Sequence, residues 1–237
     1  MQRRASGRTA LAAMVMVALS VLAGCGLGES REPFAFRIAY QALPVDGAAP
    51  SAADMEVMRQ IVESRLEATG VAALRVTVEA PDVVVVEASP ASVVDDVRSL
   101  AGVAGRVDVV PLGDTQMSEG QRIDLAAFPP LFSGDQVASA SVGSDQTGIR
   151  TVDFVLKDRG RLLLADYTRN NIGTYLAIVL DGQVISAPVI MDAIAGGEVQ
   201  ISTSRVGGFT LAQAQGLVTI LQFGELPFPL REVARSD

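Results

Sequence analysis

Residues 176–190 read LAIVLDGQVISAPVI, two apolar runs of about strand length on either side of Asp181-Gly182. An Asp-Gly pair in this setting is a strong hairpin signal, because a two-residue turn of the primed types needs positive φ angles, which Gly adopts freely and Asp tolerates. The nearest acidic residue, Asp192, lies beyond the second run, and no histidine or cysteine is close in the sequence. We therefore interpret Asp181 and Gly182 as turn residues of an antiparallel hairpin and not as an acid/base site.

The sequence before this hairpin alternates between strand and helix patterns. Ser51 and Asp54 match a capping box at the start of a helix that continues to Gly70, and Ser89-Pro90 marks the start of a second helix. The predicted elements are a strand at 34–41, a helix at 51–70, strands at 74–79 and 83–87, a helix at 89–102 and a last strand at 106–110. This βαββαβ order predicts a ferredoxin-like base over residues 34–111, with helices packed on an antiparallel sheet.

The second half of the chain has its own pattern of strands and helices. Residues 112–130 show little periodicity and contain several Gly and Pro residues, so we expect a linker there. Residues 131–230 predict a head unit with antiparallel strands and two helices, and residues 231–237 are left as a polar tail. The head strands are expected at 136–142 and 150–156, in the hairpin and near residue 200, with helices at 160–168 and 211–223. Thr210 and Gln213 form a capping box for the last helix. The expected fold class is α+β.

The composition excludes several kinds of chemistry. The chain has 237 residues, 49% hydrophobic and 19% charged, which is ample for a packed core. Cys25 is the only cysteine and there is no histidine, so the sequence allows no disulfide within the chain, no cysteine-ligated metal cluster and no Ser-His or Cys-His nucleophile. The acidic residues are scattered and match no calcium loop. We expect no enzyme activity, no catalytic residue, no metal and no cofactor.

The N-terminus predicts export and a lipid anchor. Three arginines precede a short apolar segment at 9–20, and the sequence VLAGC ends it at Cys25. This segment resembles the lipobox of bacterial lipoproteins, in which the cysteine is acylated and becomes the first mature residue, so the resemblance implies a signal peptide and lipobox at 1–25 and a tether at 26–33. An uncleaved signal anchor is the alternative, since apolar character continues to about residue 27. Small residues near Cys25 favour lipidation. Both readings place the body at the cell membrane, facing the extracytoplasmic side.

The charge of the mature chain argues against nucleic acid as a partner. Loss of residues 1–24 would remove three arginines and no acid, which leaves 16 basic and 27 acidic residues and a net charge of −11. Nucleic acids are bound through clusters of Lys and Arg, whereas Lys157 is the only lysine and the arginines are dispersed. An acidic body also repels anionic lipid, so we expect the anchor to provide the attachment to the membrane.

Several motifs of the second half resemble a known family. They are LFSGD at 131–135, NIG at 171–173, the hairpin at 176–190, IAGG at 194–197 followed by QIS at 200–202, FT at 209–210 and GELPFPL at 224–230. In this order and spacing they resemble the head of the first periplasmic domain of the SecD family, accessory subunits of the bacterial Sec protein-export machinery. The similarity extends over roughly residues 52–230, and the family's base is ferredoxin-like. Its signature residues here are Asn171, Gly173, Asp181, Gly182, Pro188, Gly196 and Gly197, which we interpret as turn-forming.

The sequence also departs from this family. Family members continue from this domain into a bundle of membrane helices that couples export to the proton gradient, whereas this sequence ends at Asp237. We therefore expect a free-standing, tethered version of the periplasmic domain that is not itself the proton-driven motor. What the resemblance carries over is a fold and a binding surface.

Two functional hypotheses follow. The first is an export-associated lipoprotein that binds translocating, unfolded chains or a Sec translocase component, by a groove or by strand addition at a sheet edge that Pro188 would limit. The alternative is an envelope adaptor or ligand-binding lipoprotein that kept the fold without an export role. An apolar, weakly charged groove between base and head would favour the first, and an enclosed pocket with convergent polar groups would favour the second.

Overall fold

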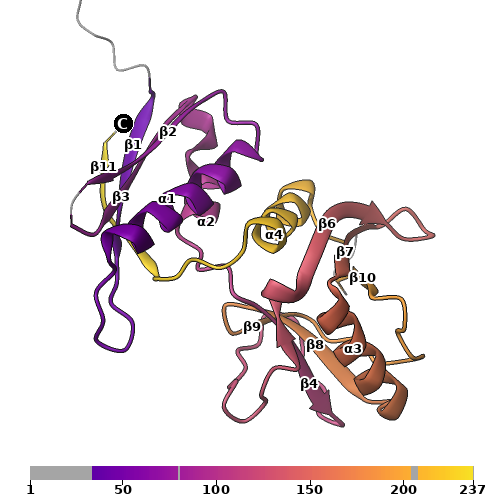
Figure 1. The fold of residues 1–237 in the computed structure, drawn as a ribbon. Coiled ribbons are helices and arrows are strands. Elements are labelled where there is room, and N and C mark those ends of the chain that lie inside the picture. Colours follow the sequence, from indigo (N-terminus) through magenta and orange to yellow (C-terminus); the bar gives the residue numbers. More distant parts are fainter. Residues whose placement is uncertain (1–33, 80, 204–207, 237) are drawn as a thin grey trace, which may run out of the picture. The chain divides into compact units, whose positions relative to one another are not determined.

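The computed structural model describes residues 34–79, 81–203 and 208–236 (Figure 1). The predicted signal peptide and lipobox, with Cys25, and the tether lie outside the described residues. Pro33–Asp237 form one compact unit. Within it, a base and a head can be followed by their separate sheets and cores.

The base is the predicted ferredoxin-like unit. Its described strands form an antiparallel sheet in the order β11-β1-β3-β2, and α1 and α2 pack together beside it. The elements are β1 (Phe36–Ala42), α1 (Ala52–Glu67), β2 (Ala73–Glu79), β3 (Val83–Ser89), α2 (Val94–Ala101) and β11 (Leu230–Ser236). This order is that of a ferredoxin-like sheet in which β11 takes the place of the fourth strand.

The first helix begins as predicted, and the second does not. The Ser51 hydroxyl accepts a hydrogen bond from the Asp54 N–H (3.2 Å), and the Asp54 carboxylate accepts one from the Ser51 N–H (2.8 Å), which completes the capping box of α1. In contrast, Ser89 does not cap α2. Its hydroxyl accepts the Ala35 N–H (2.7 Å), and a short 3-10 turn, Ala91–Val93, precedes the helix. The hydroxyl that was expected to cap the helix thus accepts a hydrogen bond from the residue before β1 instead.

The fourth strand of the base sheet was predicted wrongly. The segment predicted at 106–110 is a strand, β4 (Val107–Gly113), but it pairs with β5 (Phe132–Ser133) and β8 (Tyr175–Leu180) of the head. The predicted tail forms β11 instead and pairs antiparallel with β1. The head is therefore inserted between α2 and the last strand of the base. The alternation of side chains along a strand indicates which of its faces is buried, but it does not identify the strand with which it pairs.

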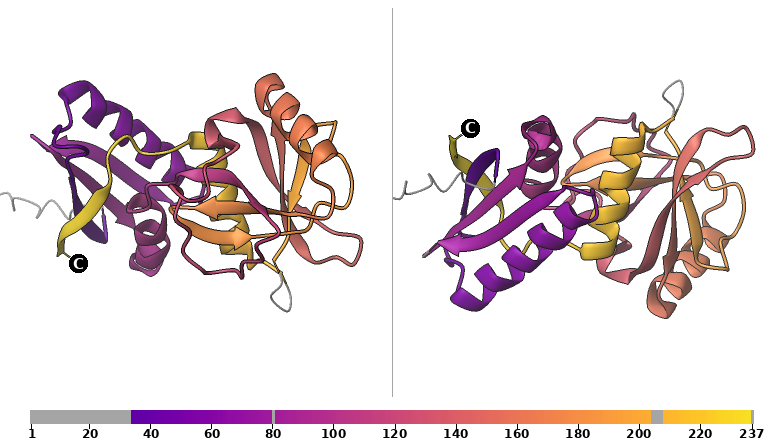
Figure 2. Two further views of the ribbon diagram at one scale, coloured as in Figure 1. Left: turned by 90° about the horizontal axis from the view of Figure 1, so that it is seen from below. Right: turned by 90° about the horizontal axis from the view of Figure 1, so that it is seen from above.

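The described residues of the head form two sheets with helices beside them (Figures 1 and 2). One described sheet has the order β5-β4-β8-β9, where β9 is Gln183–Ser186, and the other has the order β10-β7-β6. The remaining elements are β6 (Val137–Ser144), β7 (Arg150–Leu156), α3 (Asp158–Asn170), β10 (Glu198–Ile201) and α4 (Leu211–Phe223). Helix α4 packs on β6 and β7 and also contacts α1 of the base. These elements confirm the α+β class and the predicted helices of the head.

The predicted linker is part of the head. Residues 112–113 belong to β4, and the rest of the segment covers one face of the β4-β8-β9 sheet, where Ile123 is buried in a small core with Val179 and Val184. Within this segment, the Gly120 N–H donates to the Val184 carbonyl (2.8 Å) and the Val184 N–H to the Gln121 carbonyl (2.8 Å). The segment therefore also covers the outer edge of β9. Its apolar residues lack a regular period because the chain follows an irregular path over the sheet.

Asp181 and Gly182 form the predicted hairpin turn between β8 and β9. Their φ angles are 48° and 75°, both in the left-handed region that a turn of type I′ requires. Leu180 and Gln183 flank this turn and are paired with each other in the β8-β9 ladder.

Candidate functional site

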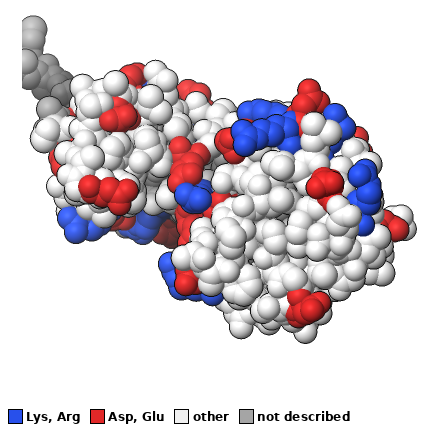
Figure 3. All heavy atoms as spheres, turned by 60° about the horizontal axis from the view of Figure 1, so that its bottom comes forward, with Lys and Arg blue, Asp and Glu red and all other residues white. Residues whose placement is uncertain are grey.

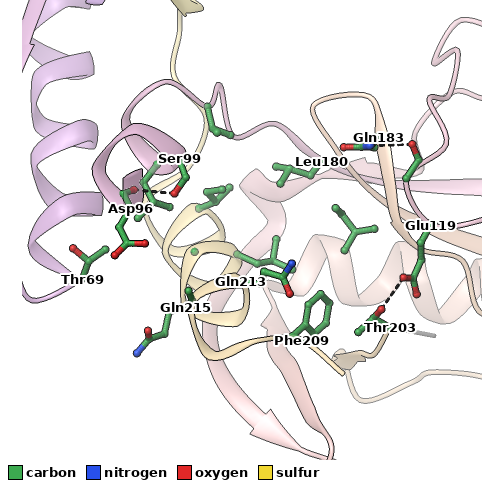
Figure 4. A pocket seen from close by; sticks show the side chains of 18 of the residues that line it. Thr69, Asp96, Ser99, Glu119, Leu180, Gln183, Thr203, Phe209, Gln213 and Gln215 are labelled. Carbon is green, nitrogen blue, oxygen red and sulfur yellow. Dashed lines mark hydrogen bonds between the residues drawn. The ribbon is translucent and has the colours of Figure 1, made fainter. Parts of the chain in front are cut away.

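A cleft of about 440 Å³ lies between the base and the head (Figure 4). Its walls come from the turn after α1, from α2, from the loop at residues 119–120, from the β8-β9 hairpin and from α4. The apolar lining residues are Val71, Val93, Leu100, Val103, Leu180, Val184, Ile185, Phe209, Ala212, Leu217 and Ile220. Segments far apart in the sequence thus build one mainly apolar surface.

Helix α4 positions a large part of this surface. Its predicted capping box is present: the Gln213 N–H donates to the Thr210 hydroxyl (3.2 Å), and the Thr210 N–H donates to the Gln213 side-chain oxygen (3.0 Å). One side of the helix is buried in the head core, whereas Ala212 is exposed in the cleft. Gly216 also faces the cleft, and a Cβ atom there would lie 3.4 Å from Leu100 of α2. This distance is an ordinary van der Waals contact, so α4 and α2 lie against each other at this point of the cleft.

The polar groups of the cleft are largely engaged with neighbouring protein atoms. The Gln183 amide donates to the Gly120 carbonyl (2.9 Å), and the Thr203 hydroxyl donates to the Glu119 carboxylate (2.7 Å), as Figure 4 shows. Asp96 and Glu119 are the charged side chains among the described lining residues. On the face drawn in Figure 3, charged side chains stand singly or in small groups between broad uncharged areas.

A buried arginine holds the junction beside the cleft. Arg65 of α1 is fully buried, and its guanidinium donates to the carbonyls of Val103 (2.7 Å), Ala104 (3.0 Å) and Gly224, with a longer contact to Leu100 (3.4 Å). Residues 103–104 lead from α2 into the head, and Gly224 follows α4 on the way back to the base. Arg65 therefore links both passages of the chain between base and head.

The sequence contains a signal for this arginine that our prediction did not use. Met55, Met58, Val62 and Leu66 form the apolar stripe of α1, and Arg65 lies on the same side of the helix. A charged residue on a buried stripe needs partners, because an unpaired buried charge is strongly unfavourable. The identity of those partners could not be read from the sequence, since three of the four carbonyls belong to segments without regular structure or to helix ends.

Asp181 lies at the same junction. Its carboxylate accepts hydrogen bonds from the N–H groups of Gly105 (3.2 Å) and Arg106 (2.8 Å), and its own N–H donates to the Arg106 carbonyl (2.9 Å). Burial lowers the pKa of Arg65 to about 10, and the negative charges of Asp181 and Glu225 act in the opposite direction. Asp181 thus fixes the first passage between base and head in addition to its place in the turn.

The family model described as the SecDF P1 head subdomain matches residues 112–228. The protein translocase subunit SecDF of Thermus thermophilus is 31% identical over 213 residues, which cover 80% of this chain and 28% of that protein. A solved structure of SecDF, a membrane component that enhances protein export, matches 84% of this chain and 98% of its own, with a TM-score of 0.67 and 28% identity.

The chain carries a SecD-type periplasmic domain. SecD of Mycobacterium tuberculosis is 47% identical over 103 residues, 42% of this chain and 17% of that protein. SecDF in its super-membrane-facing form matches 84% of this chain and 30% of its own, with a TM-score of 0.71. This chain spans 17%, 44% and 28% of the lengths of the SecD and SecDF relatives from M. tuberculosis, Sebaldella termitidis and T. thermophilus. SecD proteins are components of protein export, and this domain is extracytoplasmic in them.

Two of the signature residues of this SecD-type domain shape the end of α3. Asn171 follows the helix as its C-cap, and its side-chain amide donates to the Tyr167 carbonyl (2.8 Å). Gly173 has a φ of 88°, and its N–H donates to the Ile190 carbonyl (2.8 Å). Neither residue lines the cleft as far as the structure describes it. Their turn-forming role stays a prediction.

Pro188, Gly196 and Gly197 lie in the segment of the head between β9 and β10. Pro188 lies beyond β9, not within it as predicted, and its carbonyl accepts the Leu176 N–H (3.0 Å). Gly197 has a φ of 76°, and its carbonyl accepts the Leu156 N–H (2.9 Å). A Cβ atom on Gly196 would meet no atom within 4 Å. Pro188 contributes to a second, smaller cavity of about 120 Å³ within the head.

Among the described residues, no group of three or more acidic side chains is arranged to hold a metal ion. Across residues 34–79, 81–203 and 208–236, no helix combines the length and the apolar character that crossing a bilayer would require.

Proposed function

We propose that this SecD-type domain assists protein export by binding segments of unfolded, translocating polypeptide in the cleft, without performing chemistry on them. A lipid on Cys25 holds the domain at the extracytoplasmic face of the cell membrane. The observation that carries the proposal is the apolar lining of the cleft, which base and head build together.

The cleft suits an unfolded chain better than a small polar ligand. A translocating chain exposes apolar side chains, whose burial is favourable in proportion to the area removed from water. A site for a small ligand needs convergent polar groups, whereas Gln183 and Glu119 bond to Gly120 and Thr203 of the domain itself. This difference favours the export hypothesis over a ligand-binding lipoprotein.

Weak binding suffices in this setting. Tethering at the membrane raises the effective concentration of the domain beside an exit site, so a modest affinity gives substantial occupancy there. A Sec translocase component is the second partner that the family relationship supports, and it would bring the exit site and the cleft together.

The test is a titration of the full-length chain in nanodiscs with a secretory protein in unfolded and in folded form. We expect the unfolded form to bind and the folded form to bind at least about tenfold more weakly, a difference of about 1.4 kcal/mol. Ala212→Arg should weaken binding by about tenfold or more, because it places a charge in the apolar cleft. Leu211→Arg is the matched control, since Leu211 is the exposed neighbour on α4 that lies outside the cleft. Equal affinity for both forms, or equal effects of both variants, would contradict the proposal.

The tether has a separate test. Cys25→Ala should abolish metabolic labelling with a palmitate analogue, because the anchor requires the cysteine thiol. Wild-type protein should be labelled and should recover in the membrane fraction. Persistent labelling of the variant, or a mature N-terminus other than Cys25, would contradict the lipid anchor and leave the cleft unaffected.

A further inference from the structure

The cleft has a polar end beside Thr69 (Figure 4). Asp96 of α2 and Gln215 of α4 line the cleft at this end, and both residues are exposed. Among the described residues, the side chain of neither makes a hydrogen bond or an ion pair. A segment that lies at this end therefore meets polar groups, whereas most of the lining is apolar.

Gln215 differs in this respect from the other two glutamines that line the cleft as the structure describes it. The Gln183 amide donates to the Gly120 carbonyl (2.9 Å), and the Gln213 side-chain oxygen accepts the Thr210 N–H (3.0 Å). These hydrogen bonds hold both side chains against the protein. The amide of Gln215 has no such bond within the described part of the chain, so both its N–H donors and its oxygen can bond to a ligand.

A side-chain amide matches the backbone of an extended chain. It presents an oxygen acceptor and an NH₂ donor side by side. In an extended chain, the N–H and C=O groups of one residue point to the same side, which is why two residues in an antiparallel ladder exchange both hydrogen bonds. In a helix, the same groups are bonded within the helix itself. A glutamine amide can therefore act as a neighbouring strand toward an unfolded segment, but not toward a helix.

We propose that Gln215 binds the backbone of an extended segment in the cleft, with its amide donating to the carbonyl of one residue and accepting the N–H of the same residue. This inference rests on the proposed function and adds the mode of binding to it. Side chains of the segment pack on the apolar lining, at Phe209 and Leu217 among others. Because every residue except proline carries both backbone groups, the contact selects unfolded chains without selecting their sequence.

Peptides in which one backbone amide is replaced by an ester test this contact, because an ester lacks the N–H and leaves the charge of the peptide unchanged. The probes are an unstructured peptide with a single cluster of leucines, which fixes its register on the apolar lining, and analogues with one ester at each position in turn. They are titrated with the full-length chain in nanodiscs. We expect the ester at one position to weaken binding to wild type by about two- to tenfold, the contribution of one hydrogen bond.

Gln215→Met removes the amide and keeps the length of the side chain, and methionine is as good a helix former as glutamine. This variant should bind the all-amide peptide more weakly than wild type by a similar factor. The ester at the sensitive position should then change its affinity by less than about twofold, because both changes remove the same hydrogen bond. Gln146→Met is the matched control and should behave as wild type, since Gln146 is exposed and lies outside the described lining of the cleft.

The outcomes distinguish this inference from the proposed function. If every ester peptide binds wild type as tightly as the all-amide peptide does, the inference is overturned and the apolar cleft remains the binding site. If the sensitive position stays sensitive in Gln215→Met, or loses its sensitivity in Gln146→Met, the amide of Gln215 is not the partner and the inference is also overturned. If the all-amide peptide does not bind wild type, the proposed function itself fails.

Discussion

Replacement of Arg65 by methionine and by lysine separates hydrogen-bond geometry from charge at the junction of base and head. Arg65 is fully buried, and its planar guanidinium donates to carbonyls in both chain passages, at Val103, Ala104 and Gly224. No ion pair of Arg65 is present among the described residues. Methionine keeps most of the length and volume of the side chain without the donors or the charge, whereas lysine keeps the charge without the planar arrangement of donors.

The magnitude can be worked from these contacts. In Arg65→Met, the carbonyls of Val103 and Gly224 lose the guanidinium as hydrogen-bond donor, and each unsatisfied carbonyl lowers the free energy of unfolding by about 1–3 kcal/mol. The Ala104 carbonyl still accepts a hydrogen bond from the Leu226 N–H (2.7 Å). Against this loss, methionine removes a buried charge. Burial lowers the pKa of Arg65 from 12.5 to about 10, and a shift of this size corresponds to about 3 kcal/mol. We therefore expect Arg65→Met to lower the free energy of unfolding by about 1 kcal/mol.

Lysine should be the worse replacement. Its ammonium is compact and strongly hydrated, so it reaches fewer of the carbonyls and gives no relief from burying a charge. We expect Arg65→Lys to lower the free energy of unfolding by about 3 kcal/mol. Urea denaturation followed by circular dichroism measures both values. Wild-type stability in Arg65→Lys, together with a large loss in Arg65→Met, would refute the reasoning, because charge and not the fork of donors would then hold the junction.

Three further changes test single features of the fold. Burial raises the pKa of Glu225 above its ordinary 4.5, so ionisation of this carboxyl is unfavourable in the folded state. Glu225→Gln should therefore raise the free energy of unfolding near neutral pH. This gain should vanish below pH 4.5, where the carboxyl is protonated in both the folded and the unfolded state. A gain that is constant with pH would contradict this cause. The buried Tyr40 hydroxyl has no hydrogen-bond partner among the described residues, so Tyr40→Phe should raise the free energy of unfolding in urea by about 1 kcal/mol, and a loss would show that the hydroxyl is satisfied. Gly182→Val should lower the melting temperature through a loss of about 1 kcal/mol or more, since a β-branched residue resists a φ of 75°; an unchanged melt would show that the turn tolerates another conformation.

The local elements of this domain could be predicted because their causes are local. A capping box joins residues three positions apart, so Ser51 with Asp54 and Thr210 with Gln213 reveal the starts of α1 and α4 without knowledge of the rest of the chain. The same holds for the turn at Asp181-Gly182, where two adjacent residues decide the sign of φ. These features, with the order of strands and helices, were enough to predict a ferredoxin-like base and an α+β head.

The sequence predicted the type of candidate site but not the residues that line it. An apolar groove between base and head was an expectation of the export hypothesis, but the residues that line it belong to segments separated by long stretches of chain. Their meeting depends on how α4 packs between α1 and the head sheets. The same holds for Arg65. Its position on the apolar stripe of α1 indicates that it needs hydrogen-bond partners, but only the fold brings the carbonyls of Val103 and Gly224 to its guanidinium.

Strand partners were decided by the tertiary structure alone. Both β4 and β11 have strand character, and each could complete the base sheet as far as local sequence is concerned. In the structure, β11 pairs with β1, whereas β4 pairs with β5 and β8. The head is therefore inserted into the base, and the chain passes twice through the junction at which Arg65 lies. The physical reason is that a strand's side-chain alternation specifies its buried face, whereas its free N–H and C=O groups pair equally well with many edges, and only the packing of the whole core selects among them.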